Sequence, residues 1–303
     1  MARRKKIKES GGDRIFLAIN YFIMTFIIIA CIYPLYYCLV LSFNEGKDAM
    51  KGFIYFWPRK FTLENYKLIF RDSMILDAYI VTILRTVIGT IASVIFNAIF
   101  SYALSRKELW GRRIYISMGM ITMFFWGGTI PLYMLVRSLG LIDSFWVYIL
   151  LSLSGFYTVL IFMSFYAEIP SALLEAAKID GAHEGTIFFK IVLPISQPVM
   201  ATIALFSGVG HWSSWIESYL YINSAKLHTI PYLLVRMINQ GMAEERLRAS
   251  GQMMAFSSSS TTSVTGNSVR LATMFIAIAP IMIIYPFLQK YFIKGLLIGS
   301  VKE

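Results

Sequence analysis

The segment EAAKIDGAHEGTIFFKIVLP, residues 175–194, lies between two strongly apolar stretches of the chain. Together with the preceding IPSALL, it predicts a short helix with Pro170 in its first turn, Ser171 as its cap and Gly181 as its stop. The apolar run TIFFKIVL predicts a second helix that ends at Pro194. The pattern therefore indicates two short helices joined by a hinge.

The small residues of this segment leave two interpretations of its role open. Its alanines give the first helix a face of low relief, and Glu175, Lys178 and Asp180 supply charge. Small side chains let another surface approach closely, which favours docking of a second protein. The alternative is an amphipathic helix that lies on lipid headgroups.

The composition of the chain is that of a membrane protein. Hydrophobic residues make up 57% of its 303 residues, charged residues make up 15%, and the mean hydropathy is +0.63. The net charge of +11 comes from basic residues at the ends of apolar stretches, not from a basic stripe beside stacking aromatics. We therefore expect anionic lipid headgroups as counter-ions, and no nucleic acid as partner.

The apolar stretches predict an all-α, polytopic membrane protein with about six transmembrane helices in a single domain, residues 1–303. The expected spans are 15–42, 78–104, 114–136, 145–166, 196–222 and 269–293. Lysine and arginine are abundant in the amino-terminal tail, in the loop SRKELWGRR and near the carboxyl terminus. The positive-inside rule then places both termini and the 167–195 segment in the cytoplasm. It leaves a long external loop at 223–268, which by composition is a flexible linker, and a cytoplasmic tail at 294–303.

Two cysteines, Cys31 and Cys38, lie in one apolar stretch. On a helix they are separated by roughly 10 Å along the axis, too far for a disulfide. The tetrapeptide IIAC at 28–31 faintly resembles a lipoprotein cleavage site, but the apolar stretch continues beyond it, so an uncleaved first span is expected.

The hinge segment resembles the EAA loop of binding-protein-dependent ATP-binding cassette (ABC) import permeases. The match consists of Glu175-Ala176-Ala177, three residues, Gly181, nine residues, and then Ile191-x-Leu193-Pro194. The strings EIPSALLEAAKIDGA and FKIVLPISQPVMAT are similar to the carbohydrate-importer branch, which includes the smaller maltose-type permease subunit and related sugar permeases of Gram-positive bacteria. The resemblance implies the type I ABC importer permease fold and location in a bacterial cell membrane.

The resemblance also implies a set of partners for import of a sugar or oligosaccharide. These are a second permease subunit, two cytoplasmic ATPase subunits and an extracellular solute-binding protein. The segment would couple the spans to a cleft of the ATPase, where Glu175 would meet a basic residue and the apolar residues after Gly181 would fill the cleft. The implied coupling residues are Glu175, Ala176, Ala177, Asp180, Gly181, Ile191, Leu193 and Pro194. The 294–303 tail would enter between the two ATPase subunits.

The chain itself has no phosphate-binding loop of the form G-x-x-x-x-G-K-[ST]. We therefore expect it to bind no cofactor, whereas the partner ATPase would use ATP and Mg²⁺. A polytopic membrane enzyme is a rival class. Against this class, the three histidines of the chain are scattered and no catalytic motif is present. Glu217 is the only carboxylate inside the expected spans. A permease for a non-sugar solute is the second alternative.

The string GHWSSWIESY in the fifth expected span contains candidates for the substrate path: His211, Trp212, Ser214, Trp215 and Glu217. Tryptophan faces stack on sugar rings, while hydroxyl and carboxylate groups bond their edges. The alternative is an aromatic belt at the membrane interface.

Polar and aromatic residues of two other expected spans complete the candidate set. Asn97 and Trp126 are added to the path, although Asn97 could instead bond across helices. Gly127 and Gly128 predict close packing or a bend. Arg85 is expected to be structural or to extend toward the outer interface.

Overall fold

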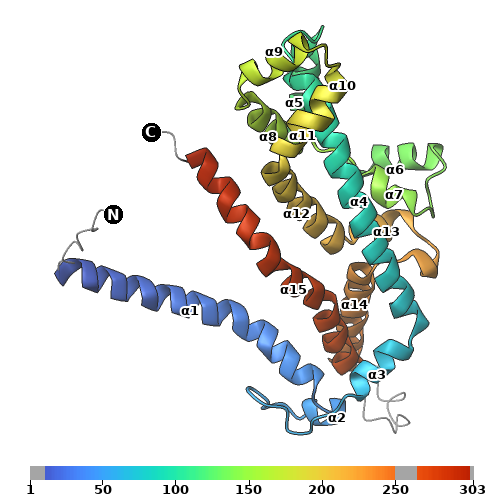
Figure 1. Ribbon diagram of the computed structural model, residues 1–303. Coiled ribbons are helices and arrows are strands. Elements are labelled where there is room, and N and C mark those ends of the chain that lie inside the picture. Colours follow the sequence, from blue (N-terminus) through green and yellow to red (C-terminus); the bar gives the residue numbers. More distant parts are fainter. Residues whose placement is uncertain (1–10, 250–264, 301–303) are drawn as a thin grey trace. The chain divides into compact units, whose positions relative to one another are not determined.

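The computed structural model describes residues 11–249 and 265–300, and this part of the chain is helical and contains no β-strand (Figure 1). The all-α prediction is confirmed. The chain divides into two compact units, Met1–Ile69 with Glu244–Ile276, and Phe70–Ala243 with Ala277–Glu303. Each unit is described by itself.

The helices follow one another along the chain with short connections. In order they are α1 (Gly11–Ser42), α2 (Gly46–Ala49), α3 (Glu64–Arg71), α4 (Ser73–Ser105), α5 (Arg112–Phe124), α6 (Thr129–Ser138), α7 (Trp146–Leu150), α8 (Phe156–Ala167), α9 (Ser171–Ile179), α10 (Glu184–Ile187), α11 (Leu193–Ile195), α12 (Gln197–Ser213), α13 (Ile216–Tyr221), α14 (Ile230–Ala249) and α15 (Gly266–Ser300). A π-helical segment, Phe188–Val192, connects α10 to α11, and a 3₁₀ turn, Ala225–Leu227, precedes α14.

Three helices in the described residues are long and apolar enough to cross a membrane: Gly12–Ser42, Ser73–Ser105 and Gly266–Ile284. Three bent helix pairs pass the same test if each pair is counted as one crossing. The described residues thus contain three to six candidate spans, and the prediction of about six lies at the upper end of this range.

Breaks interrupt three of the predicted spans. The third bends by 118° between α5 and α6, at the predicted pair that ends in Gly128, whose φ is +92°. The fourth is not one helix: α7 ends at Leu150, and α8 begins only at Phe156. The fifth is broken at Ser214 and Trp215. The prediction of continuous helices over 145–166 and 196–222 is therefore wrong.

The predicted stop at Gly181 is confirmed. Gly181 has a φ of +77°, its N–H bonds the Lys178 carbonyl at 3.0 Å, and the Ala182 N–H bonds the Ala177 carbonyl at 3.0 Å. This pair of hydrogen bonds forms a Schellman motif, which requires a left-handed residue and so favours glycine. The predicted cap at Ser171 is wrong, because Ser171 is already helical and Pro170 precedes the helix without a side-chain cap.

The second helix of the segment does not end at Pro194. Proline lies inside α11, and the helical path continues to Ile195 before it bends by 78° into α12. The π-helical segment Phe188–Val192 lies directly before α11. Its wider turn changes the hydrogen-bond register ahead of a residue that cannot donate a backbone hydrogen bond.

The first unit contains a network of polar contacts between α1 and α3. Asn65 donates to the Ser42 and Asn44 carbonyls at 2.8 and 3.1 Å. Arg59 pairs with Asp48 at 3.1 Å between its Nε and the carboxylate. These contacts give the predicted first external loop a defined structure. Cys31 and Cys38 are free thiols, as predicted.

The predicted flexible linker at 223–268 is wrong over much of its length. Ile230–Ala249 forms the helix α14, and α15 begins at Gly266. Most of the serine-rich stretch lies outside the described residues. The predicted tail at 294–303 continues α15 as far as Ser300, and its last three residues also lie outside the described residues.

In the second unit, α4 packs along α12 and α8. One apolar cluster joins these helices to the segment after Gly181 and includes Phe162, Ile187 and Val192. A closer contact lies at Gly89, where a Cβ atom would be 2.5 Å from the His211 ring. Glycine therefore allows α4 and α12 to approach each other at this point.

Candidate functional site

Arg85 on α4 forms hydrogen bonds with residues at the break in the fifth predicted span. Its Nη1 donates to the Ser214 carbonyl at 2.9 Å, and its Nη2 pairs with the Glu217 carboxylate at 2.9 Å. The guanidinium also lies over the Tyr148 ring, 4.7 Å from the centroid. The Arg85 side chain is only 1% exposed, so its use is structural and it does not extend to the outer interface.

Asn97, further along α4, bonds the break in the fourth predicted span. Its Nδ2 donates to the Leu153 carbonyl at 3.0 Å, and its Oδ1 accepts a bond from the Ser154 hydroxyl at 2.9 Å. Non-helical backbone inside a membrane protein must find partners within the protein or line a cavity. Two polar residues of α4 therefore satisfy carbonyls that the two breaks leave free.

A polar cavity of about 530 Å³ lies where these two breaks face α4. Hydroxyl groups are abundant in its lining. The residues that line it are Arg85, Ser93, Ser152, Ser154, Gly155, Tyr157, Thr158, Ile161, Ile203, Phe206, Ser207, Gly210, His211, Ser214 and Glu217. Discontinuous helices that flank a polar cavity are a common construction for substrate sites in transporters.

Two buried side chains in this lining have hydrogen-bonding capacity left over. Arg85 Nε and both ring nitrogens of His211 lack a partner with hydrogen-bond geometry among the described residues. The His211 ring packs against the Gly89 backbone and is 4% exposed. Buried polar atoms are usually satisfied, so the Arg85 Nε donor and the two His211 ring nitrogens retain unused hydrogen-bonding capacity beside the cavity.

The structure brings only part of the predicted substrate path to this cavity. His211, Ser214 and Glu217 line it, and Asn97 lies behind it, bonded to Ser154. Trp215 does not line it and instead contacts Tyr219, with 5.9 Å between ring centroids and the rings tilted by 60°. Trp126, in the bend between α5 and α6, is 74% exposed and also lies outside the lining. The roles assigned to these residues remain predictions.

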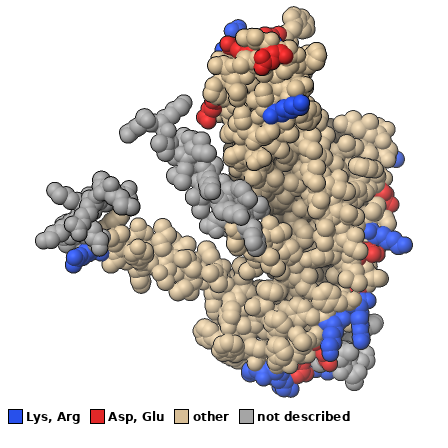
Figure 2. Space-filling view, viewed as in Figure 1, with Lys and Arg blue, Asp and Glu red and all other residues tan. Residues whose placement is uncertain are grey.

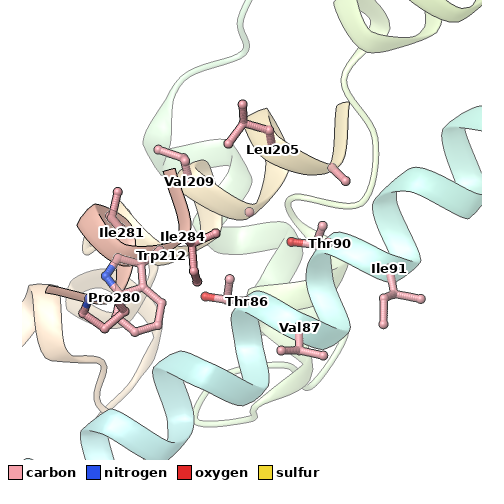
Figure 3. Close-up of a pocket in the computed structure, with 12 residues that line it drawn as sticks. Thr86, Val87, Thr90, Ile91, Leu205, Val209, Trp212, Pro280, Ile281 and Ile284 are labelled. Atoms are coloured by element: carbon pink, nitrogen blue, oxygen red, sulfur yellow. The ribbon is translucent and has the colours of Figure 1, made fainter. Parts of the chain in front are cut away.

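Trp212 faces a second, apolar pocket of about 280 Å³ (Figure 3). Its indole N–H donates to the Ala277 carbonyl at 2.9 Å, so its polar atom is already satisfied. Figure 3 shows Ile284 of α15 beside Thr86 of α4 in this pocket, and Val87 and Ile281 also line it. Such a lining offers a sugar few hydrogen bonds.

The segment predicted to couple to an ATPase, residues 167–195, presents a charged surface and several exposed apolar side chains. Figure 2 shows acidic and basic side chains gathered over the end of the second unit that carries α9. Glu175, Ala176 and Asp180 are exposed there, and Glu175 forms no ion pair among the described residues. The exposed large apolar side chains of the segment are Leu173, Ile179, Phe189 and Ile195.

Other apolar residues of this segment belong to the protein's own core. Ile187, Phe188 and Val192 are at most 4% exposed, so the prediction that the apolar residues after Gly181 fill a partner's cleft is wrong for these three. Ala177 and Leu193 are half-buried against the same core, Ile191 is half-buried, and Pro194 is exposed. Their predicted coupling roles are not decided by burial.

The chain is similar to a transport system permease protein over nearly its whole length. It is 35% identical over 292 residues to the polygalacturonan/rhamnogalacturonan transport system permease protein YtcP of Bacillus subtilis, which covers 96% of this chain and 99% of the relative. This chain belongs to the sugar ABC transporter permeases. The permease is also 34% identical to protein LplC of Bacillus subtilis, over 100% of both chains. No protein-family model matches it.

A solved structure agrees with the fold of this permease. A chain of a bacterial ABC transporter involved in the import of the acidic polysaccharide alginate superposes with a TM-score of 0.83 and 27% identity, over 95% of this chain and 100% of that one. The predicted ABC importer permease fold is confirmed. The permease is a multi-pass membrane protein and a transport subunit. This interpretation takes the place of the alternative that the chain is a membrane enzyme.

Sequence reasoning missed part of the cavity of this permease. Ser93, Ser152, Ser154, Tyr157 and Thr158 line it and were not among the candidates. A signal was present, because serines and a glycine cluster in the string LSLSGFYT, where they weaken a helix in the middle of an apolar stretch.

Proposed function

We propose that this permease moves a sugar or oligosaccharide into a bacterial cell through the polar cavity between α4, α8 and α12. The observation that carries the proposal is the pair of broken spans, whose freed carbonyls bond Arg85 and Asn97 beside a serine-rich cavity. Hydroxyl groups bond hydroxyl groups without desolvating a net charge, so this lining suits a carbohydrate.

The charges in the cavity favour recognition through sugar hydroxyl groups. The positive charge of Arg85 is compensated by Glu217 at 2.9 Å, which leaves the pair without net charge. Beyond this pair, the lining offers the hydroxyl groups of Ser152 and Ser207, together with Arg85 Nε and the His211 ring, which lack partners among the described residues. Relatives with names that specify galactooligosaccharides, in Bacillus subtilis, and arabinooligosaccharides, in Halalkalibacterium halodurans, support the oligosaccharide class.

The transport cycle also needs partners. We infer that a second permease subunit completes the pathway, that an extracellular solute-binding protein delivers the sugar, and that two cytoplasmic ATPase subunits hydrolyse ATP with Mg²⁺. Glu175, Ala176, Asp180 and the exposed Ile179 on α9 support docking of an ATPase. A helix that presents charge around exposed apolar residues matches the anatomy of a protein interface.

Uptake measurements on matched serine variants test the cavity. Ser207→Leu adds bulk to the lining on α12, whereas Ser138→Leu makes the same change on the exposed surface of α6. Uptake of the transported sugar by Ser207→Leu should fall by about tenfold or more at low substrate concentration, because a misfit group costs on the order of 1–3 kcal/mol. Ser138→Leu should transport normally. Normal uptake by Ser207→Leu would exclude this cavity from the pathway.

Reporter fusions test the membrane orientation. A reporter after Arg113 should lie in the cytoplasm, and one inserted near Ser258 should lie outside, as the distribution of lysine and arginine predicts. Both termini would then face the cytoplasm beside the ATPase subunits. Two reporters on the same side would contradict the proposed number of crossings between them.

A further inference from the structure

A carboxylate at the start of α10 bonds two separate elements of the second unit. Glu184 Oε2 accepts a hydrogen bond from Tyr102 at 2.6 Å and pairs with Arg106 Nη2 at 3.0 Å. Glu184 Oε1 pairs with Lys178 Nζ at 3.2 Å. Tyr102 lies in the last turn of α4, Arg106 is the residue that caps the carboxyl-terminal end of α4, and Lys178 belongs to α9. One side chain therefore joins the coupling helix to a membrane span.

Contacts of the Tyr102 ring support the same joint. The Arg106 guanidinium lies over the Tyr102 ring at 4.4 Å and also donates to its hydroxyl. The Tyr102 ring in turn packs on Phe188, with 5.0 Å between centroids. The Arg106 side chain is 17% exposed, so water screens this side of the joint only partly. Arg106 is thus held by both the ring and the carboxylate.

The helix on the membrane side of this joint is unbroken. α4 runs through 33 residues from Ser73 to Ser105, whereas the helices that pack on it are bent or interrupted. Arg85, which lines the cavity, precedes Arg106 by 21 positions, or roughly 32 Å of helical rise. A continuous helix is stiff, so a displacement at one end is carried to the other.

We propose that Glu184 is a positioning residue that transmits movement of the coupling helix α9 through α4 to the cavity. The inference rests on the proposed function, because it takes α9 to be the element that an ATPase moves. Glu184 acts through Lys178 on one side and through Tyr102 and Arg106 on the other. Its role is distinct from docking, since its carboxylate is directed at residues of its own chain.

The protonation state of the joint agrees with this role. Partial burial raises the pKa of the Glu184 carboxyl, but the contacts with Tyr102, Lys178 and Arg106 outweigh it and lower the pKa below its usual range. The same carboxylate raises the pKa of Lys178, with a further contribution from Glu108. Both groups, which lie on the short helices beyond the ends of the apolar spans, are charged at neutral pH.

The test uses the complete transporter in vesicles and measures sugar transported per ATP hydrolysed. Glu184→Gln keeps the shape of the side chain and removes its charge, and Arg106→Gln removes the charged partner at the end of α4. Each variant should lower the ratio by about threefold to tenfold, as changes along a coupling network do. The double variant should be no worse than the worse single variant, because both remove the same interaction.

Arg137→Gln is the matched control for Arg106→Gln, since Arg137 is exposed on α6, away from this segment, and forms no ion pair among the described residues. Its ratio should equal that of the original protein. An unchanged ratio in Glu184→Gln, or losses that multiply in the double variant, would overturn the proposal. If Glu184→Gln assembles poorly with the ATPase, Tyr102→Phe removes one donor and keeps the ring on Phe188; an unchanged ratio there would also overturn it.

A second measurement separates this inference from the proposed function. Amide hydrogen exchange of residues 100–106 with and without ATP reports movement at the end of α4 and needs no sugar. Glu184→Gln should abolish most of the ATP-dependent change. Retention of the full change in Glu184→Gln would refute the role of Glu184. Absence of sugar uptake by the unmodified transporter would instead refute the proposed function.

Discussion

Replacement of Arg85 by methionine removes the positive half of the ion pair in the cavity. The change deletes the bond to Glu217 at 2.9 Å, the bond to the Ser214 carbonyl at 2.9 Å and the contact with the Tyr148 ring at 4.7 Å. The Glu217 side chain is only 14% exposed, so its charge would be left without a partner in a poorly solvated site. Breaking a buried pair in this way costs about 3–5 kcal/mol.

The double variant Arg85→Met with Glu217→Gln separates the lost pair from the stranded charge. Removing both charges together avoids the isolated carboxylate, so it should be more stable than Arg85→Met alone by about 2 kcal/mol. Arg137→Met is the control, because Arg137 is exposed on α6 and its loss should change the free energy of unfolding by less than about 0.5 kcal/mol.

Thermal unfolding of the purified permease in detergent measures these differences. At about 2 °C or more per kcal/mol, Arg85→Met should lower the melting temperature by at least about 6 °C. The double variant should recover part of that loss. A melting temperature for Arg85→Met within about 2 °C of the original protein would refute the reasoning, as would a double variant that is no more stable than Arg85→Met.

Three further predictions concern the glycines and the charge joint. Gly181→Val should reduce sugar uptake and stimulated ATP hydrolysis while membrane insertion persists, because β-branched residues tolerate a φ of +77° poorly. The control Gly185→Ala should transport normally, because the space around its Cβ position is open. Normal transport by Gly181→Val would contradict the hinge. Gly89→Ala should lower the free energy of unfolding, measured by denaturation, by about 1–3 kcal/mol, because its Cβ would lie 2.5 Å from a ring carbon of His211. Gly208→Ala should be less destabilising, because its Cβ meets only the Thr90 hydroxyl at 3.4 Å. Equal stabilities of the two variants would contradict this prediction. Burial raises the pKa of Glu184, but its partners outweigh burial and lower it, so the contribution of this ion pair to coupling is present above the usual carboxyl range and is lost only as pH falls through the lower folded pKa. The amount of sugar transported per ATP should therefore be constant between about pH 6 and 8. A change of this ratio with pH inside that window would contradict the prediction.

The features that the sequence predicted correctly depend on neighbouring residues. Membrane location follows from apolar stretches, and the Gly181 stop follows from the conformational freedom of glycine after a helix. The bend near Gly128 is of the same kind. Each of these can be inferred from a short window, because hydropathy and backbone torsion angles are largely local properties.

The breaks in the fourth and fifth predicted spans were not visible in the same way. The residues on both sides of each break are apolar, so a hydropathy window averages across it. Whether the helix continues there depends on partners elsewhere: Asn97 bonds a carbonyl 56 positions away, and Arg85 bonds one 129 positions away. A carbonyl freed from its helix is tolerated only where such a partner is present.

The sequence by itself determined that this chain is a helical membrane protein with a helix stop at Gly181, whereas the coupling role of that hinge stays a prediction. The tertiary structure decided which side chains share the cavity: it placed Arg85 with Glu217 and turned Trp212 to an apolar pocket. It also buried Ile187 in the chain's own core. The reason is that a residue type specifies what a side chain can bond, whereas packing between distant segments determines which group it meets.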